Sequence, residues 1–516
     1  MAQQSVASLL ERNKKAQANA LLWHDLYDTA RSLAMPQRNL FSKTSAGADK
    51  MAGVYDSTGI KAANNFVNTM QTSLTPPFVK WASLVAGVAI AEEQRGEVNQ
   101  SLSVITDTMF AIMNASNFNT AISEFYYDLC LGTSALLILE GDDDKPLNYI
   151  SVPIEQLALE EGAFGQVGAV FRKHKIPARV IEKQWRNVKL NSDLQAIIKD
   201  KPTEKVELLE ITYEEQDESG KKTWYYEVIH EASKARIVEQ KFLNSNPWIV
   251  TRYYKMPNEI FGRGTLLQAL PDLKMLNKGK ELAIKSAQLN AFGVYTVADD
   301  GVINPNTLRI LPGGFIPVGR NGGANGASIA PLPRSGDPNL QELMFTDLRA
   351  SIEEIMLNKP LPPVQGGVRS ATEIIERLKE SQVTIGSAFG RLMHEFIQPM
   401  LQRTLDILTT RGLVQLPEPI KIDNFFVDIK IESPIAKAQN LEDINSLVQA
   451  FQIVGGVDPS LVGLAYKIED LGEIVGEKLG VPAELIRSKE EREQIQEQAA
   501  QAAQQQAQAQ AEQQQQ

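Results

Sequence analysis

Apolar residues at helical spacing dominate residues 1–120 and predict helices there. Three segments place apolar residues three or four positions apart, which is the spacing of one helix face: 16–33, 60–74 and 102–113. Pro36 follows the first segment and Pro76-Pro77 follow the second. Proline has no backbone N–H to donate, so these prolines mark helix ends.

From Thr133 the apolar pattern shortens and predicts strands. Short apolar runs rich in β-branched or aromatic residues recur at 133–139, 149–152, 168–171, 206–213, 224–229 and 248–254. The polar segment 216–222 contains Gly220 and separates two of these runs, which is typical of a hairpin turn. We therefore expect an α+β unit with an antiparallel sheet that ends near residue 255.

A long helical pattern covers 265–290, with apolar residues and lysines on different faces of the helix. The apolar residues fall within one arc of the helix: Leu266, Leu270, Leu273, Leu276 and Ile284. The lysines fall together on another face: Lys274, Lys278 and Lys285. Pro271 lies near the start of the helix, where a proline costs less than in the interior.

A segment rich in glycine, proline and asparagine, 298–337, separates this helix from another at 339–358. After a second Pro/Gly break, Ser370-Ala-Thr-Glu373 is a capping-box sequence. It opens a helix that ends near Gly412 and is bent at Pro399. At 1.5 Å per residue, its roughly 40 residues span about 60 Å. That is longer than a compact domain requires and indicates a spoke in a large assembly.

The end of the chain holds a strand at 425–431, short helices over 437–488 and a Gln-rich tail over 491–516. The tail has too little apolar surface to fold alone. The fold class is therefore α+β and mainly α. The formal net charge is −11, so the field of the whole molecule repels nucleic acid, and any contact with DNA should be local and weak.

Candidate catalytic and metal-binding residues are sparse. The single cysteine, Cys130, cannot form an internal disulfide, and its apolar surroundings favour a buried thiol over a nucleophile. None of the four histidines has a second histidine or cysteine at metal-ligand spacing. Asp142-Asp143-Asp144 indicates a solvated turn, because the alternating ligands of a calcium loop are missing. We expect no catalytic residue, no metal site and no cofactor.

Two further classes of protein are disfavoured. Gly279-Lys280 lacks the upstream glycine and the hydroxyl residue of a P-loop, so an ATPase is not expected. The first residues lack the basic and apolar regions of a signal peptide. No apolar run approaches the ~18 residues that cross a bilayer, so we expect no membrane span.

Five short motifs follow one another along the chain: Ala34-Met-Pro-Gln-Arg-Asn-Leu-Phe41, Gly59-Ile-Lys-Ala-Ala-Asn-Asn-Phe66, Pro77-Phe-Val-Lys-Trp81, Asn114-Ala-Ser-Asn-Phe118 and Phe261-Gly-Arg-Gly264. In their order and spacing, and in the Gln-rich tail, the chain resembles the head-to-tail connector (portal) family of short-tailed double-stranded DNA bacteriophages. The resemblance covers roughly residues 10–490.

The resemblance implies a subunit with wing, stem, clip and crown regions, assembled as a ring of twelve. The regions would be an N-terminal wing (1–255), a first stem helix (256–297), a clip (298–337), a second stem helix (338–358), a tunnel loop (359–370), a long wing helix with a strand (371–434), a crown (435–490) and the tail (491–516). Clip residues of this family face the packaging motor and later the tail, and the candidates here are Phe315, Arg320 and Arg334.

The resemblance also implies partners and a location. Double-stranded DNA would pass through the ring with weak, non-specific contacts during packaging by a terminase large subunit and during ejection. Other partners would be capsid, scaffolding, tail adaptor and tail proteins. The location would be the portal vertex of the virion, and the host cytoplasm during assembly. No nucleotide site is visible, so the energy would come from the partner ATPase.

Candidate channel residues are Lys274, Lys278 and Lys285 of the 265–290 helix, together with Lys359 and Arg369. The lysines allow two interpretations: a basic stripe facing DNA, or a solvated face that pairs with acidic residues of a neighbouring subunit. The candidate tunnel loop consists mostly of residues without a polar side chain: Pro360, Pro362, Pro363, Gly366 and Gly367. This composition favours a stiff collar over a loop that grips DNA.

Two other functions remain open. The chain could be another structural component of the virion, such as a scaffold, although a coiled-coil scaffold would lack the helix–loop–helix–loop–long-helix order. It could also be a metal-dependent nuclease that uses Asp299-Asp300. A nuclease would need a third carboxylate close in space, and DNA cleavage with a divalent cation would support it.

Overall fold

The computed structural model describes residues 4–38, 41, 47–87, 89–91, 94–185, 188–216, 222–243, 245–292, 295–297, 329–331, 338–357, 388–415 and 427–431, and beyond these 444, 446–454, 456, 471–472 and 475–476. The chain divides into two compact units. The first is formed by 1–25, 64–265 and 360–516, and the second by 26–63 and 266–359. The boundary between them falls inside helices α1 (Val6–Ala34) and α2 (Thr58–Leu74).

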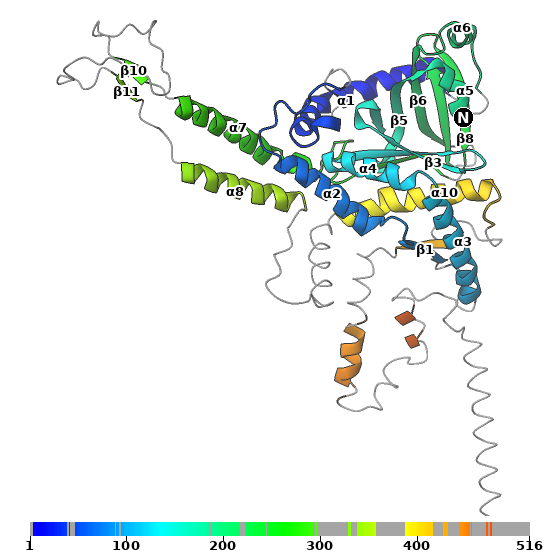
Figure 1. Cartoon of the computed structure of the whole chain (residues 1–516). Coiled ribbons are helices and arrows are strands. Elements are labelled where there is room, and N and C mark those ends of the chain that lie inside the picture. The colour runs from blue at the N-terminus through cyan, green and yellow to red at the C-terminus, as the bar shows by residue number, and fades with distance from the viewer. Residues whose placement is uncertain are drawn as a thin grey trace, which may run out of the picture. The chain divides into compact units, whose positions relative to one another are not determined.

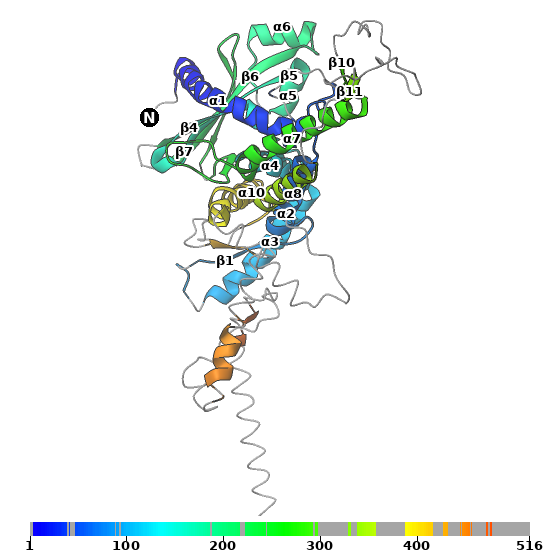
Figure 2. The same cartoon turned by 90° about the vertical axis from the view of Figure 1, so that its left-hand side faces the viewer.

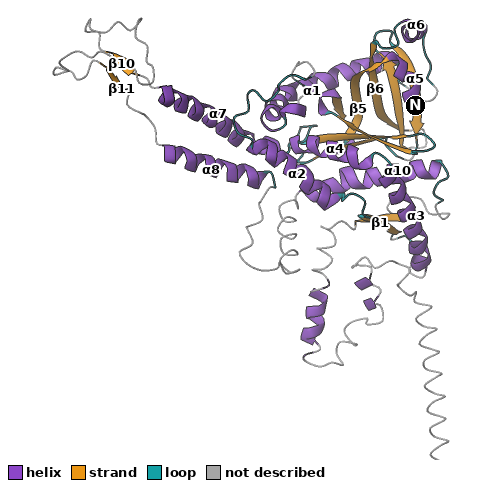
Figure 3. Ribbon diagram, in the orientation of Figure 1, coloured by secondary structure: helices purple, strands orange, loops and turns teal. Residues whose placement is uncertain are grey.

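The first unit is built on antiparallel sheets (Figures 1 and 3). The largest has the order β4-β5-β6-β7-β8, with β4 Leu157–Glu161, β5 Val167–Pro177, β6 Lys205–Gln216, β7 Lys222–His230 and β8 Ala235–Phe242. Each strand pairs with the next one in the chain, so the sheet is a meander. The expected hairpin at 216–222 is present, because Gln216 pairs with Lys222 across it.

Helices cover both faces of the five-stranded sheet. The N-terminal part of α1 crosses one face (Figure 2), where Arg12 binds Glu160 at 2.9 Å and lies 5.5 Å above the Tyr213 ring. On the other face, Trp185 follows the short helix α5 (Ile181–Gln184) and donates from Nε1 to the Tyr226 hydroxyl at 2.9 Å. Helix α6 (Ser192–Asp200) begins at Asn191, whose side chain caps the Leu194 N–H.

A buried polar group lies within this sheet. Glu210 is fully buried and accepts from Arg172 at 3.2 Å and from the Tyr226 hydroxyl at 3.0 Å. His174 is also buried, with its Nε2 3.2 Å from Glu210 Oε1. Burial, aided by the nearby Arg172 guanidinium, lowers the pKa of His174 to about 3. The imidazole is therefore neutral in the folded protein at any pH above that value.

We expect His174 to make the protein sensitive to acid. In the unfolded chain its pKa is near 6.5, so below that pH the unfolded state binds a proton that the folded state does not. Stability should fall as the pH drops from 6.5, by about 2 kcal/mol at pH 5. Denaturant unfolding of the wild type and of His174→Leu at pH 7 and pH 5 measures this. Equal losses in the two proteins would contradict the assignment.

A second sheet of the first unit, here called the central sheet, has the order β3-β2-β9. Its strands are β2 Thr133–Glu140, β3 Leu147–Val152 and β9 Trp248–Arg252. Helix α4 (Phe118–Leu131) packs on β2 and β3, and α10 (Gln398–Thr410) packs on β2. Almost every residue of β2 is therefore buried.

Strand β1 (Ala82–Ala86) pairs with β12 (Val427–Ile431), far away in the chain. Helix α3 (Arg95–Ala115) completes β1 with side chains: Asn99 Oδ1 accepts from the Ala86 N–H at 2.7 Å, and Thr106 Oγ1 from the Leu84 N–H at 3.1 Å. Neither α4 nor β1 was expected from the sequence. In helix α4 only Thr120 and Glu124 are exposed, so its polar side is narrow and its apolar residues are not confined to one recognisable face.

The expected long helix at 371–412 is described from residue 388 onward. It runs through a π-helical turn, Met393–Ile397, into α10. Pro399 has no N–H to donate to the Glu395 carbonyl four residues earlier. That carbonyl instead accepts from the Thr251 hydroxyl of β9 at 3.3 Å. This hydrogen bond therefore links the π-helical turn to the central sheet.

The second unit contains two long helices, α7 (Thr265–Phe292) and α8 (Pro338–Ile355). Both match the expected helices at 265–290 and 339–358. At their far end β10 (Tyr295–Val297) pairs antiparallel with β11 (Ile329–Pro331). The expected boundaries of the wing, stem, clip and crown regions remain predictions.

Candidate functional site

The pair of helices α7 and α8 carries the lysines that sequence analysis singled out. The two helices run antiparallel and side by side (Figure 1). Ser351 donates to Asp272 at 2.7 Å, and Lys280 lies 3.5 Å from Glu342 nearer the far end. A Cβ atom added at Gly279 would lie 2.6 Å from Cε1 of Phe345, so glycine lets the two helices approach closely.

The loop before α2 holds the near end of this helix pair. Asn277 accepts from the Tyr55 N–H at 2.7 Å and donates to the Gly53 carbonyl at 2.9 Å. Asp56 forms an ion pair with Arg349 of α8 at 3.0 Å. Burial raises the pKa of Asp56, but hydrogen bonds from Thr58 and the Arg349 guanidinium outweigh it and hold that pKa below its usual value.

The three candidate lysines of α7, Lys274, Lys278 and Lys285, are exposed. Glu281 lies among them on the same helix and accepts from Lys278 at 2.8 Å and from Lys285 at 2.5 Å. These two hydrogen bonds lower the pKa of Glu281 to about 2. The acid therefore stays ionised and offsets part of the positive charge of the stripe. Glu281 was not among the residues expected from the sequence, although it lies three residues after Lys278 and four before Lys285.

The remaining site residues expected from the sequence lie outside the described residues. They are the channel candidates Lys359 and Arg369, the tunnel-loop residues Pro360, Pro362, Pro363, Gly366 and Gly367, and the clip residues Phe315, Arg320 and Arg334. Asp299-Asp300 of the nuclease alternative also lie outside them.

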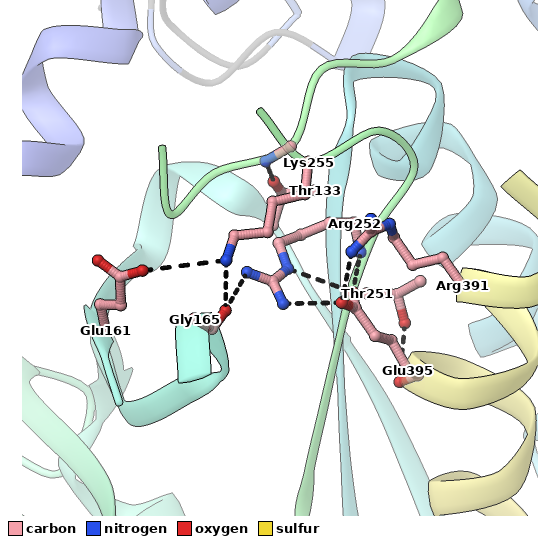
Figure 4. Close-up of polar contacts among 9 residues, drawn as sticks. Thr133, Glu161, Gly165, Thr251, Arg252, Lys255, Arg391 and Glu395 are labelled. Atoms are coloured by element: carbon pink, nitrogen blue, oxygen red, sulfur yellow. Dashed lines mark hydrogen bonds and ion pairs between the residues drawn. The ribbon is translucent and has the colours of Figure 1, made fainter. Parts of the chain in front are cut away.

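A buried ion pair in the first unit joins the central sheet to the long helix (Figure 4). Arg252, at the end of β9, binds the Glu395 carboxylate through Nη2 at 2.7 Å and Nε at 3.2 Å. The Arg252 backbone N–H donates to the same carboxylate at 2.9 Å. Arg391, one turn before Glu395, adds a contact at 3.2 Å. Only 5% of the Arg252 side chain and 13% of the Glu395 side chain are exposed.

The same arginine also reaches the β4–β5 hairpin (Figure 4). Arg252 Nη1 donates to the Gly165 carbonyl at 3.1 Å, and Lys255 Nζ donates to that carbonyl at 2.7 Å. Three separate parts of the chain therefore meet at Arg252: the hairpin, strand β9 and the π-helical turn. This group was not expected from the sequence, because no local spacing links residues that lie 87 or 143 positions apart.

The described residues contain little that resembles catalytic chemistry. Among them, no group of three or more histidine, cysteine or acidic side chains is placed to hold a metal ion. Cys130 is buried, with its sulfur 3.8 Å from the Thr265 hydroxyl. Gly141 and Asp142 accept hydrogen bonds from Arg411 through their carbonyls, so this turn is bound to the end of α10. Among the helices of the described residues, none has the length and hydrophobicity of a membrane span.

Comparison with known proteins gives a consistent picture. The family model described as bacteriophage head to tail connecting protein matches residues 6–486. The probable portal protein of Bordetella phage BPP-1 is 22% identical over 466 residues, covering 85% of this chain and 81% of its own. The portal protein of Salmonella phage epsilon15 is 22% identical (84% and 79%), and that of Escherichia phage T7 is 21% identical (77% and 73%).

Two solved structures are also similar in part. One is the neck of an empty GTA particle, at 11% identity and a TM-score of 0.35, covering 75% of this chain and 84% of that one. The other is the virion of a native gene transfer agent particle, at 12% identity and a TM-score of 0.33, covering 82% and 94%.

Proposed function

The chain belongs to the family of bacteriophage head to tail connecting proteins, and from that membership we propose that it assembles into a twelve-subunit ring around a DNA channel. The single observation that carries the proposal is the family match over residues 6–486, nearly the whole chain. Its relatives are portal proteins of several phages. The chain is accordingly a phage portal protein, which is a structural component of the virion and not an enzyme.

The helix pair of the second unit supports the assignment of regions. Helices α7 and α8 would form the stem, and the segment between β10 and β11 would form the clip. The antiparallel pairing of these two strands brings the ends of that segment together. The chain therefore leaves the helix pair at β10 and rejoins it at the adjacent β11, as expected for an insertion at the end of a stem.

The charge distribution favours a channel through which DNA slides over a channel that binds DNA tightly. A ring multiplies every phosphate contact by its number of subunits, so strong binding would stall a sliding duplex. The net charge of −11 and the pairing of Lys278 and Lys285 with Glu281 both keep such contacts weak. We assign the tunnel loop at 359–370 to the narrowest part of the channel on its composition.

The partners follow from the same proposal. A terminase motor would drive DNA inward through the ring, and the tail adaptor would dock on the clip. The crown at 435–490 would face the capsid interior, where scaffolding and capsid proteins assemble around the ring. Assembly would take place in the host cytoplasm.

Electron microscopy of the purified full chain in negative stain tests the proposal. We expect rings with a central hole, and twelve-fold symmetry in end-on class averages. Rings with another symmetry would overturn the subunit number alone. Compact monomers at micromolar concentration would overturn the ring.

A further inference from the structure

The outer face of α7 combines exposed apolar side chains with a surplus of positive charge. Met275 and Leu282 are 57% and 55% exposed. They lie beside the exposed lysines Lys274, Lys278 and Lys285. The whole helix carries four lysines against Asp272 and Glu281. Large apolar side chains on a helix surface, rimmed by charge, are typical of a protein interface.

The outer face of α8 has the opposite charge. Leu343 and Met344 are 68% and 50% exposed, and Asp347 and Glu354 are exposed along the same side. The helix carries four acidic residues against one arginine. That arginine, Arg349, is bound to Asp56 and Glu342. The inner face, with Phe345 and Ile352, is buried.

The structure points to these two faces as the two halves of one interface between copies of this chain. We infer that the outer face of α7 (Lys274, Met275, Lys278, Leu282 and Lys285) packs against the outer face of α8 (Leu343, Met344, Asp347 and Glu354) of the neighbouring copy. Each copy then offers a basic face on one side of its helix pair and an acidic face on the other. Such a head-to-tail contact closes into a ring under rotation.

The heights of the residues along the helix pair agree with this arrangement. Within one copy, Asp272 lies level with Ser351, and Lys280 lies level with Glu342 and Phe345. Rotation about an axis along the pair keeps these heights. The height of Lys278 along the axis therefore differs by no more than about one helical turn from that of the neighbouring copy's Asp347. The same holds for Leu282 and the neighbouring copy's Leu343. The inference rests on the proposed ring, and it assigns the lysines to a subunit contact.

Paired charge reversals test the interface in the full chain. The first variant is Lys274→Glu with Lys278→Glu, and the second is Asp347→Lys with Glu354→Lys. Each places like charges across every contact, so we expect the fraction of protein in rings, measured by mass photometry, to fall by about tenfold or more. The matched control is Lys183→Glu with Lys199→Glu, two exposed lysines of the first unit; it should assemble like the wild type. Circular dichroism spectra should be unchanged in all three.

Mixing the two reversed proteins provides the decisive measurement. In an alternating ring, every α7 face again meets an α8 face of opposite charge, so an equimolar mixture should recover rings while neither protein does alone. Rings from either variant alone, at the level of the control, would overturn the interface and leave the ring itself in place. A mixture that stays unassembled would also overturn it. Absence of rings from the wild type would instead overturn the proposed function.

Discussion

Replacing Glu395 by alanine should lower the free energy of unfolding by about 3–5 kcal/mol, because it leaves Arg252 charged and buried without its partner. Arg252 is 5% exposed and directs Nε, Nη2 and its backbone N–H at this one carboxylate. Water cannot replace those contacts at so buried a position. Denaturant unfolding at pH 7, monitored by circular dichroism, measures the change.

A surface ion pair of similar length provides the control. Lys80 and Asp107 are 2.8 Å apart, with side chains 36% and 62% exposed. Asp107→Ala should cost less than about 1 kcal/mol. The double replacement Arg252→Met with Glu395→Leu should cost less than Glu395→Ala alone, since no unpaired charge is left. A loss below 1 kcal/mol for Glu395→Ala would contradict the role of Arg252 as the residue that joins hairpin, strand and long helix.

Replacing Gly264 by alanine should destabilise the fold by more than about 3 kcal/mol or prevent folding altogether. The added Cβ would lie 2.2 Å from the Cys130 carbonyl oxygen and 2.6 Å from the Gly132 nitrogen. Both atoms belong to the backbone at the end of α4, so neither can move aside without disturbing β2. The Gly264 N–H also donates to the Leu131 carbonyl at 2.8 Å. Soluble yield and denaturant unfolding report the loss.

Gly96→Ala is the matched control, because no atom lies within 4 Å of its added Cβ. That residue lies at the start of α3, where alanine has the higher helix propensity, so stability should stay unchanged or rise by up to about 1 kcal/mol. A Gly264→Ala protein as stable as Gly96→Ala would show that the backbone approach in this segment is not required.

The same contact gives the structural reason for a motif that was visible in the sequence. Phe261-Gly-Arg-Gly264 precedes α7, and both of its glycines pass against the backbone of 130–132. Gly132 has a φ of +136°, a conformation that favours glycine, and ends α4 there. In the sequence alone, the motif indicated only the resemblance to the family. The glycines are needed because two backbone segments cross there, and the sequence does not show that the second segment is 130–132.

Local patterns were sufficient for the long, one-sided elements. The apolar arc of α7 is buried at Leu266, Leu270, Leu273 and Leu276, as expected, and α8 spans almost the expected residues. The last member of the arc, Ile284, is instead 42% exposed. The strands β2, β3, β6, β7 and β9 also lie where short apolar runs predicted them. These elements follow from the sequence because the residues that determine them are neighbours along the chain.

Contacts between distant segments were decided only by the tertiary structure. The sequence by itself determined the mainly helical α+β class, the two helices around a Gly/Pro-rich segment and, through its resemblance, the family. The tertiary structure decided that β1 pairs with β12 and that Arg252 reaches both Glu395 and Gly165. It also decided that the exposed faces of α7 and α8 carry opposite charges. Helical and strand periods depend on neighbouring residues, whereas packing depends on which distant surfaces exclude water together.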